Sequence, residues 1–218
     1  MAIARTWLLV AAEKREFDGI LQRFGASSNW DWPAEFAREA RFGGDRFLLA
    51  ANGPGPRLAA RALEKRIAVD GIISTGFCGA LDSALRVGDI VLGRSESCPA
   101  GVEILSMDRV ITTAKERREL RESTGAAAVE MESAAVARKA AEWGVPFRCI
   151  RAVSDSAAED LPLDFNLYRD EEGRFSRRRI ALAALARPFT RVPALLRLDR
   201  NTKIAARSLG DYFAHCRL

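Results

Sequence analysis

The sequence is poor in the residues that build metal sites and histidine-based catalysis. It has a single histidine, His215, three residues from the end, and its four cysteines are far apart and form no C-x-x-C pair. These features argue against a Cys/His metal site and against Ser-His-Asp or Cys-His chemistry. We expect no metal, His215 at the surface, and the cysteines as reduced thiols of a cytoplasmic protein.

Long apolar runs are also missing. No run approaches the ~20 residues that span a bilayer. The first apolar stretch, Trp7 to Ala12, is cut off by charged residues, so it is too short for a signal peptide and is better explained as a buried strand. No G-x-G-x-x-G follows it, which disfavours a Rossmann dehydrogenase. A chain of 218 residues, 48% of them apolar and 29% charged, predicts one globular domain over residues 1–218.

The net charge of +5 is concentrated in the tail. Residues Gly173 to Leu218 include 11 basic and 2 acidic residues, so this segment carries +9 and the rest of the chain −4. A basic protein often binds nucleic acid, but here no binding motif or interleaved aromatic residue accompanies the charge. We therefore expect no nucleic-acid partner and a basic helical segment over about 174–218.

Apolar strand-like runs alternate with helix-like segments along the chain. Strands are predicted at 5–12, 36–42, 46–51, 71–75, 89–92, 102–105 and 147–153, and helices at 14–24, 58–68, 114–122 and 132–143. This alternation predicts an α/β fold with a mixed, largely parallel β-sheet flanked by helices on both faces. Ligands of such sheets bind at the carboxyl ends of the strands.

Four clusters of polar residues or glycines stand beside the predicted strand ends. They are Ala12-Glu13-Lys14-Arg15-Glu16, Ser74-Thr75-Gly76-Phe77-Cys78-Gly79-Ala80-Leu81 with Val87-Gly88-Asp89 beyond, Val129-Glu130-Met131-Glu132-Ser133, and Arg151-Ala152-Val153-Ser154-Asp155. Taken alone, the charge of Glu16 and the glycine turn are weak signals of a functional site. A carboxylate at a helix start also stabilises the helix dipole, and many turns contain glycine.

The carboxylates of the last two clusters are more informative. Glu130 and Glu132 lie in an apolar junction, and because burying an unpaired carboxylate is costly, one of them should have a partner. Sugar hydroxyls would suit, since a carboxylate accepts two hydrogen bonds at once. Asp155 follows a strong strand, where a carboxyl group is either a candidate general acid or the cap of a helix or turn.

Together the clusters resemble the nucleoside phosphorylase and nucleosidase family. The order A-x-x-x-E, T-G-x-x-G-x-L followed by V-G-D, V-E-M-E-S and R-A-x-S-D is similar to that family from Leu8 to Asp155, and methylthioadenosine/S-adenosylhomocysteine nucleosidases are the closest well-known branch. The resemblance implies a three-layer sandwich that cleaves the N-glycosidic bond of a purine nucleoside, with adenine as the expected base. It also implies a homodimer and no cofactor other than phosphate as an alternative co-substrate.

The resemblance implies roles for individual residues. Asp155 is similar in position to the group that protonates N7 of the purine, and Glu16 to the carboxylate that positions water. Met131 and Glu132 match ribose contacts, with Glu132 holding the 2′- and 3′-hydroxyls. The other expected substrate contacts are Glu130, Phe77, Cys78, Gly79, Ser154, Val110 and Ile111. An acid at the base and a carboxylate near a cation-like sugar suit glycosidic bond cleavage.

The chain departs from the phosphorylases of this family at the glycine turn. Those enzymes usually have a small hydroxyl residue where Phe77 stands and an arginine just before the turn, and this chain has neither. Arg15 and Arg57 remain candidate phosphate ligands. Since Glu16 favours water as the nucleophile, we expect hydrolysis ahead of phosphorolysis. The alternative is a non-catalytic nucleoside-binding module on the same fold.

The tail carries a second, weaker resemblance. Asp160-Leu161-Pro162, Arg187-Pro188 and the segment from Pro193 to Leu198 resemble hopanoid-associated nucleoside phosphorylases, which act on an adenosyl group joined to a lipid. The stretch between Gly93 and Val129 also looks shorter than in common nucleosidases. Both observations predict an unusual 5′ substituent.

The last part of the tail has helical periodicity. A largely apolar stripe is formed by Leu195, Leu198, Thr202, Ala205, Leu209 and Tyr212. Basic residues lie off the stripe, so the segment is predicted to be a basic amphipathic helix. The stripe packs on the domain or a partner subunit in one interpretation, and the helix contacts an anionic membrane surface in the other.

Overall fold

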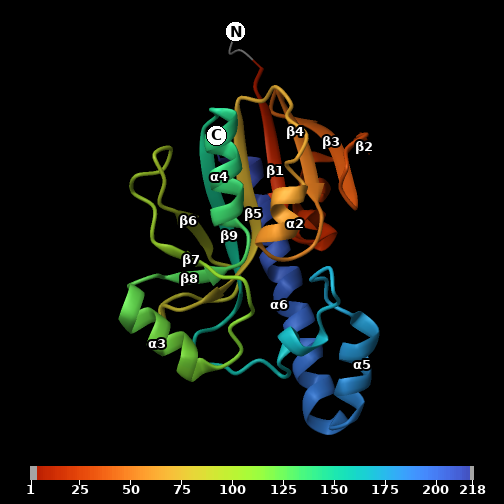
Figure 1. The fold of residues 1–218 in the computed structure, drawn as a ribbon, viewed down its shortest axis with the longest axis vertical. Coiled ribbons are helices and arrows are strands. Elements are labelled where there is room, and N and C mark those ends of the chain that lie inside the picture. Colours follow the sequence, from red (N-terminus) through yellow and green to blue (C-terminus); the bar gives the residue numbers. More distant parts are fainter. Residues whose placement is uncertain (1–3, 217–218) are drawn as a thin grey trace.

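The computed structural model describes residues 4–216 as a central β-sheet with helices on both faces (Figure 1). Nine strands of the described residues form this sheet, in the order β2-β3-β4-β1-β5-β8-β7, with β9 paired to β5 and β6 paired to β9. The strands are β1 (Thr6–Ala11), β2 (Ser27–Asn29), β3 (Phe36–Phe42), β4 (Asp45–Ala51), β5 (Gly71–Ala80), β6 (Ile90–Gly93), β7 (Ile104–Ser106), β8 (Ala128–Glu130) and β9 (Phe147–Asp155).

The middle of the sheet is parallel. β1 pairs in parallel with β4 and β5, and β5 pairs in parallel with β9. Antiparallel pairs are added by β8 on β5 and by β6 on β9. The predicted strands 36–42 and 46–51 form the antiparallel hairpin of β3 and β4, which turns at Gly43 and Gly44 with φ angles of 59° and 93°. The predicted mixed α/β sheet is confirmed.

The side chains of β1 point alternately into two hydrophobic clusters, one on each face of the sheet. The helices are η1 (Lys14–Phe17), α1 (Asp18–Phe24), α2 (Pro56–Arg61), α3 (Ala114–Thr124), α4 (Ser133–Trp143), η2 (Phe165–Tyr168), α5 (Arg177–Leu185) and α6 (Pro188–His215). Trp7 and Leu9 pack toward α1 and α6, whereas Leu8 and Val10 pack toward α2 and α4. Because successive residues of a strand point to opposite faces, this pattern produces the three layers.

Two predicted boundaries are wrong by several residues. The helix expected over 58–68 ends at Arg61. The strand expected over 71–75 continues to Ala80, because β9 pairs with β5 along the glycine-rich segment up to Gly79. The residues predicted to form a glycine turn are therefore the last residues of this central strand.

The basic tail forms two helices in place of one segment. α5 and the N-terminal half of α6 project beyond the sheet, and the C-terminal half of α6 packs on α1 (Figure 1). A Cβ on Gly19 would lie 1.8 Å from the carbonyl oxygen of Ala206, so this helix contact requires glycine. Thr202 and Leu209 of the predicted stripe are buried here, which confirms packing on the domain for this half.

The remaining surface expectations can be compared directly with the structure. Cys78, Cys98, Cys149 and Cys216 are free thiols, and His215 is exposed with its Nδ1 2.7 Å from the carbonyl oxygen of Asp211. Within residues 4–216, no helix has both the length and the apolarity needed to cross a bilayer.

Candidate functional site

A cavity of about 500 Å3 opens where β1, β5, β8 and β9 end. Four separate chain segments predicted from the sequence meet in it. Its lining includes Arg15, Glu16, Phe77, Cys78, Gly79, Val110, Ile111, Glu130, Met131, Glu132, Ser154 and Asp155. The structure therefore brings together all but one of the predicted site residues.

Arg57 is the exception. Its Nη2 donates to the carbonyl oxygen of Glu171 at 3.0 Å, and its side chain lines a separate hollow beside Pro56 and Gly173. Arg57 is the second residue of α2 and does not line the cavity that holds the other predicted residues. The structure therefore does not bring Arg57 together with them.

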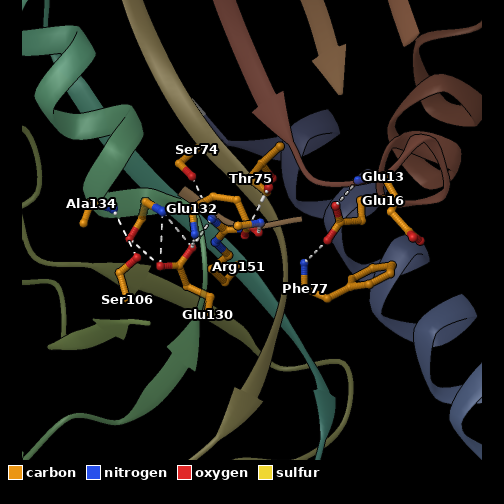
Figure 2. Close-up of polar contacts among 12 residues, drawn as sticks. Glu13, Glu16, Ser74, Thr75, Phe77, Ser106, Glu130, Glu132, Ala134 and Arg151 are labelled. Carbon is orange, nitrogen blue, oxygen red and sulfur yellow. Dashed lines mark hydrogen bonds and ion pairs between the residues drawn. The ribbon is translucent and has the colours of Figure 1, made fainter. Parts of the chain in front are cut away.

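Glu16 is held at the cavity wall by two backbone amides. Its Oε1 accepts the amide of Phe77 at 2.7 Å, and its Oε2 accepts the amide of Glu13 at 2.8 Å as part of a capping box (Figure 2). A Cβ on Gly76 would lie 2.5 Å from Oε1, so only glycine leaves room for the carboxylate. Burial raises the pKa of Glu16 above its ordinary value, although Arg151 opposes the shift.

Arg151 of β9 is the centre of a buried charged network below the cavity (Figure 2). Its guanidinium donates to the carbonyl oxygen of Thr75 at 2.9 Å and to Ser74 Oγ at 2.7 Å, and it forms an ion pair with Glu130. Glu130 also accepts the Ser133 hydroxyl at 2.7 Å and two backbone amides. These contacts occupy the Glu130 carboxylate, which therefore stabilises the junction of β8 and α4.

Glu132 is less constrained than Glu130, although only two residues separate them. Its Oε1 accepts the amide of Gly55 at 2.8 Å, and its Oε2 lies 3.6 Å from Arg151 Nη1. Burial raises the pKa of Glu132 to about 8, with Glu130 and Glu16 adding to the rise and Arg151 opposing it. A buried carboxyl group with one close hydrogen bond is suited to accept further donors from a ligand.

Asp155 is the last residue of β9 and lines the same cavity as Glu132. Its Oδ1 accepts the Ser154 hydroxyl at 2.6 Å, and its Oδ2 forms an ion pair with Arg117 of α3. The Arg117 side chain is only 1% exposed. It was predicted only as part of a charged helix. Its buried position could have been predicted from its spacing, because Arg117 is three residues from Leu120 and so lies on the same inward face of the helix.

Arg151 is a second residue that sequence reasoning left without a role. It stands inside the R-A-x-S-D motif, yet no local pattern shows that its side chain points toward Glu130 rather than toward solvent. The signal that could have found it is the pair of carboxylates in V-E-M-E-S, because two buried carboxylates require a buried cation.

The cavity continues from the charged groups into an apolar end. This end is lined by η2, α5, α6 and the segment between η2 and α5, through Phe165, Phe175, Ile180, Ala181, Leu195 and Leu198. Between the two ends, the loop that carries Val110 is tied to Asn166, whose side chain donates to the Val110 carbonyl and accepts the Val110 amide, both at 2.9 Å.

Three arginines that line the cavity, Arg15, Arg109 and Arg117, are paired with carboxylates. Arg15 Nε lies 2.6 Å from Glu13 Oε2, and Arg109 forms an ion pair with Glu116. Among residues 4–216, no group of three or more His, Cys, Asp or Glu side chains is placed to hold a metal ion. The site therefore consists of carboxylates held by backbone amides and guanidinium groups.

Comparisons with known proteins show the family and the fold. The sequence model of the phosphorylase superfamily matches residues 11–96 and 102–188. A 5′-methylthioadenosine/S-adenosylhomocysteine nucleosidase of Shewanella oneidensis is 27% identical in an alignment of 163 residues. The match covers 55% of this chain and 69% of that protein.

Solved structures show the same fold. Futalosine hydrolase of Helicobacter pylori superposes with a TM-score of 0.70 at 17% identity, covering 96% of both chains. The 5′-methylthioadenosine/S-adenosylhomocysteine nucleosidase of Neisseria meningitidis, in complex with methylthio-immucillin-A, has a TM-score of 0.67 at 22% identity, covering 97% of this chain and all of that one.

Proposed function

The chain belongs to the phosphorylase superfamily, and we propose that it hydrolyses the N-glycosidic bond of an adenine nucleoside. Family membership confirms the predicted family, fold class and enzyme class, a nucleosidase or nucleoside phosphorylase. The observation that carries the proposal is the position of three carboxyl groups, Glu16, Glu132 and Asp155, around one cavity at the strand ends.

Asp155 is the general acid of this proposal. Its proton moves to N7 of the purine, the bond between C1′ and N9 breaks, and the electron pair of that bond stays on the departing base. The sugar carries the positive charge that develops. Ser154 and Arg117 hold the two carboxyl oxygens of Asp155 in place, which supports this role because proton transfer needs a fixed geometry.

Glu16 activates the water that completes the reaction. The water oxygen attacks C1′, and its proton passes to the Glu16 carboxylate. The burial that raises the pKa of Glu16 makes the carboxylate a stronger base. Exchange with solvent then returns the proton to Asp155 and removes it from Glu16.

Glu132 binds the ribose in this proposal. The 2′- and 3′-hydroxyls donate to its carboxylate, which compensates the burial that otherwise disfavours the ionised form. Met131 lines the same part of the cavity and packs against the sugar. Phe77, Cys78, Gly79, Val110 and Ile111 surround the base.

Hydrolysis is favoured over phosphorolysis by the charges in the cavity. Arg15, Arg109 and Arg117 each pair with a carboxylate, so a phosphate dianion beside the carboxyl groups would have to displace one of these partners, whereas Arg177 lies on α5. The test is product analysis on adenosine and methylthioadenosine with and without phosphate. We expect free ribose or its 5′-substituted form at a rate independent of phosphate. A phosphate-dependent sugar 1-phosphate would replace hydrolysis by phosphorolysis.

The apolar end of the cavity supports a large apolar 5′ substituent, such as the hopanoid lipid implied by the tail. Leu195 and Leu198 of the predicted stripe line it, together with Ile180 of α5. Such surfaces bind hydrocarbon by removing apolar area from water. A 5′-alkyl adenosine should therefore have a lower KM than adenosine, and equal KM values would remove the lipid from the proposal.

The tip formed by α5 and the start of α6 supports contact with an anionic membrane. Leu182, Leu185 and Leu196 are 69%, 64% and 59% exposed, and Phe189 is 93% exposed, beside several arginines. Exposed apolar and basic side chains together suit the interface of an acidic bilayer. Co-sedimentation with vesicles should require anionic lipid and weaken with salt. Absence of binding at low ionic strength would make the tip an ordinary surface.

The oligomeric state and the compartment complete the proposal. We propose a homodimer in the cytoplasm, as the family resemblance implies. Light scattering of the purified chain tests the first, because a mass near 48 kDa is twice the 24.0 kDa of one chain. Fractionation of cells tests the second.

A further inference from the structure

Arg117 is a buried guanidinium in a helix whose other charged side chains face solvent. It extends from α3 to Asp155 and lines the cavity. Its neighbours Lys115, Arg118 and Glu119 are exposed. Taking a cation out of water is costly, so a buried arginine needs compensating partners.

The partners of Arg117 come from the segments that surround the proposed base site. Its Nη2 donates to the carbonyl oxygen of Ile111 at 3.0 Å, and its Nη1 donates to that of Ser156 at 3.1 Å. The Ile111 loop follows β7, and Ser156 directly follows Asp155. One guanidinium therefore connects the loop beside the base to the end of the strand that carries the acid.

The ion pair between Arg117 and Asp155 has no room to move toward β5. A Cβ on Gly79 would lie 2.8 Å from Asp155 Oδ2 and 3.0 Å from Arg117 Nη1. The strand backbone thus packs directly against the ion pair. The planar fork of arginine can bind Asp155 and the backbone carbonyls together, which the single ammonium of lysine cannot do in the same geometry.

We propose that Arg117 positions Asp155 for proton transfer to the purine and holds the Ile111 loop against the base. This inference rests on the proposed function, because it assigns Arg117 a role through the general acid. The role is positional, since Arg117 acts on the reaction through Asp155.

The experiment compares Arg117→Gln and Arg117→Lys with the control Arg121→Gln. Arg121 lies one turn further along α3 and pairs with Asp82 at 2.6 Å, away from the acid. We expect Arg117→Gln to lower kcat at least about tenfold with a smaller change in KM. Arg117→Lys keeps the cation but loses the planar fork, so it should restore part of kcat, and Arg121→Gln should match the wild type.

The outcomes separate this inference from the proposed function. If Asp155→Asn retains turnover, the proposed acid fails. If Asp155→Asn is inactive but folded Arg117→Gln has the wild-type kcat, the Arg117 inference fails. Should Arg117→Gln not fold, a folded Arg117→Lys with reduced kcat supports the inference, and one with wild-type kcat makes Arg117 a structural residue only.

Discussion

The two ends of the cavity are built from different parts of the molecule. At one end, short segments after β-strands hold carboxyl groups through backbone amides and buried arginines. At the other, η2, α5 and α6 contribute mainly apolar side chains. The difference teaches that the sheet holds the proposed reacting groups in fixed geometry, whereas the tail provides a surface whose shape depends on helix packing. We expect substitutions at the first end to change kcat and those at the second to change substrate preference.

The largest effect is expected at Asp155. Asp155→Asn removes the proposed proton donor, so kcat should fall by at least about 10²-fold while the fold survives. Steady-state kinetics and circular dichroism provide the measurements. Asp199→Asn is the matched control, because Asp199 lines the apolar end of the same cavity. Near-wild-type turnover in folded Asp155→Asn would assign the reaction to another group.

The next effect concerns stability rather than catalysis. Glu130→Gln leaves the fully buried Arg151 without its principal ion-pair partner, which should cost roughly 3–5 kcal/mol in the free energy of unfolding. Denaturant unfolding measures this loss. Glu39→Gln, which breaks a part-exposed pair with Arg46, should cost much less. A loss for Glu130→Gln no larger than that of this control would mean that Arg151 finds a replacement partner.

Glu132→Gln should distinguish substrates by their sugar. The proposed contacts involve both ribose hydroxyls, so kcat/KM should fall much more for ribonucleosides than for 2′-deoxynucleosides. Both substrates are measured with the same purified variant. An equal loss on both would indicate that Glu132 supports the structure through Gly55 and Arg151.

Glu132 should also affect how stability depends on pH. Its pKa is about 8 in the folded protein and near 4.5 in the unfolded chain, so the folded state binds the proton more tightly. The resulting stabilisation is fully present below the unfolded value and is lost as the pH rises through about 8. The Tm of the wild type should therefore decrease across this window more than that of Glu132→Gln. Parallel Tm profiles would contradict this raised pKa.

The smallest effect on the reaction itself is expected at the apolar end. Ile180→Asp places a charge in the wall of the cavity and should raise KM for a 5′-alkyl adenosine while adenosine is little affected. Leu182→Asp on the same helix is the control, because Leu182 is exposed and does not line the cavity. Equal effects of Ile180→Asp on both substrates would place the 5′ group elsewhere.

Residues adjacent to strand ends were predictable from sequence because their positions follow from a local pattern. Once an apolar run is a parallel strand, its carboxyl end lies at the ligand-binding edge of the sheet, and Glu16 and Asp155 follow such runs. The order of the four motifs predicted the family, and the alternation of strand-like runs with helix-like segments predicted the fold class. These are properties of short stretches of chain.

Tertiary structure decided which of these residues are free to bind a ligand. Glu130 and Glu132 share one motif, but Arg151 from β9 occupies the first and leaves the second partly open. Arg117 lies in a helix of exposed charges, and only the approach of α3 to the end of β9 makes it a partner of Asp155. Arg57 was a candidate phosphate ligand, and in the structure it lines a separate hollow. The sequence by itself determined the main strands of the sheet, apart from β2 and β8, and the chemical groups at its edge. Pairing among buried charges depended on contacts between distant segments. Burying a charge is unfavourable unless a partner compensates it, and only the tertiary structure brings that partner close.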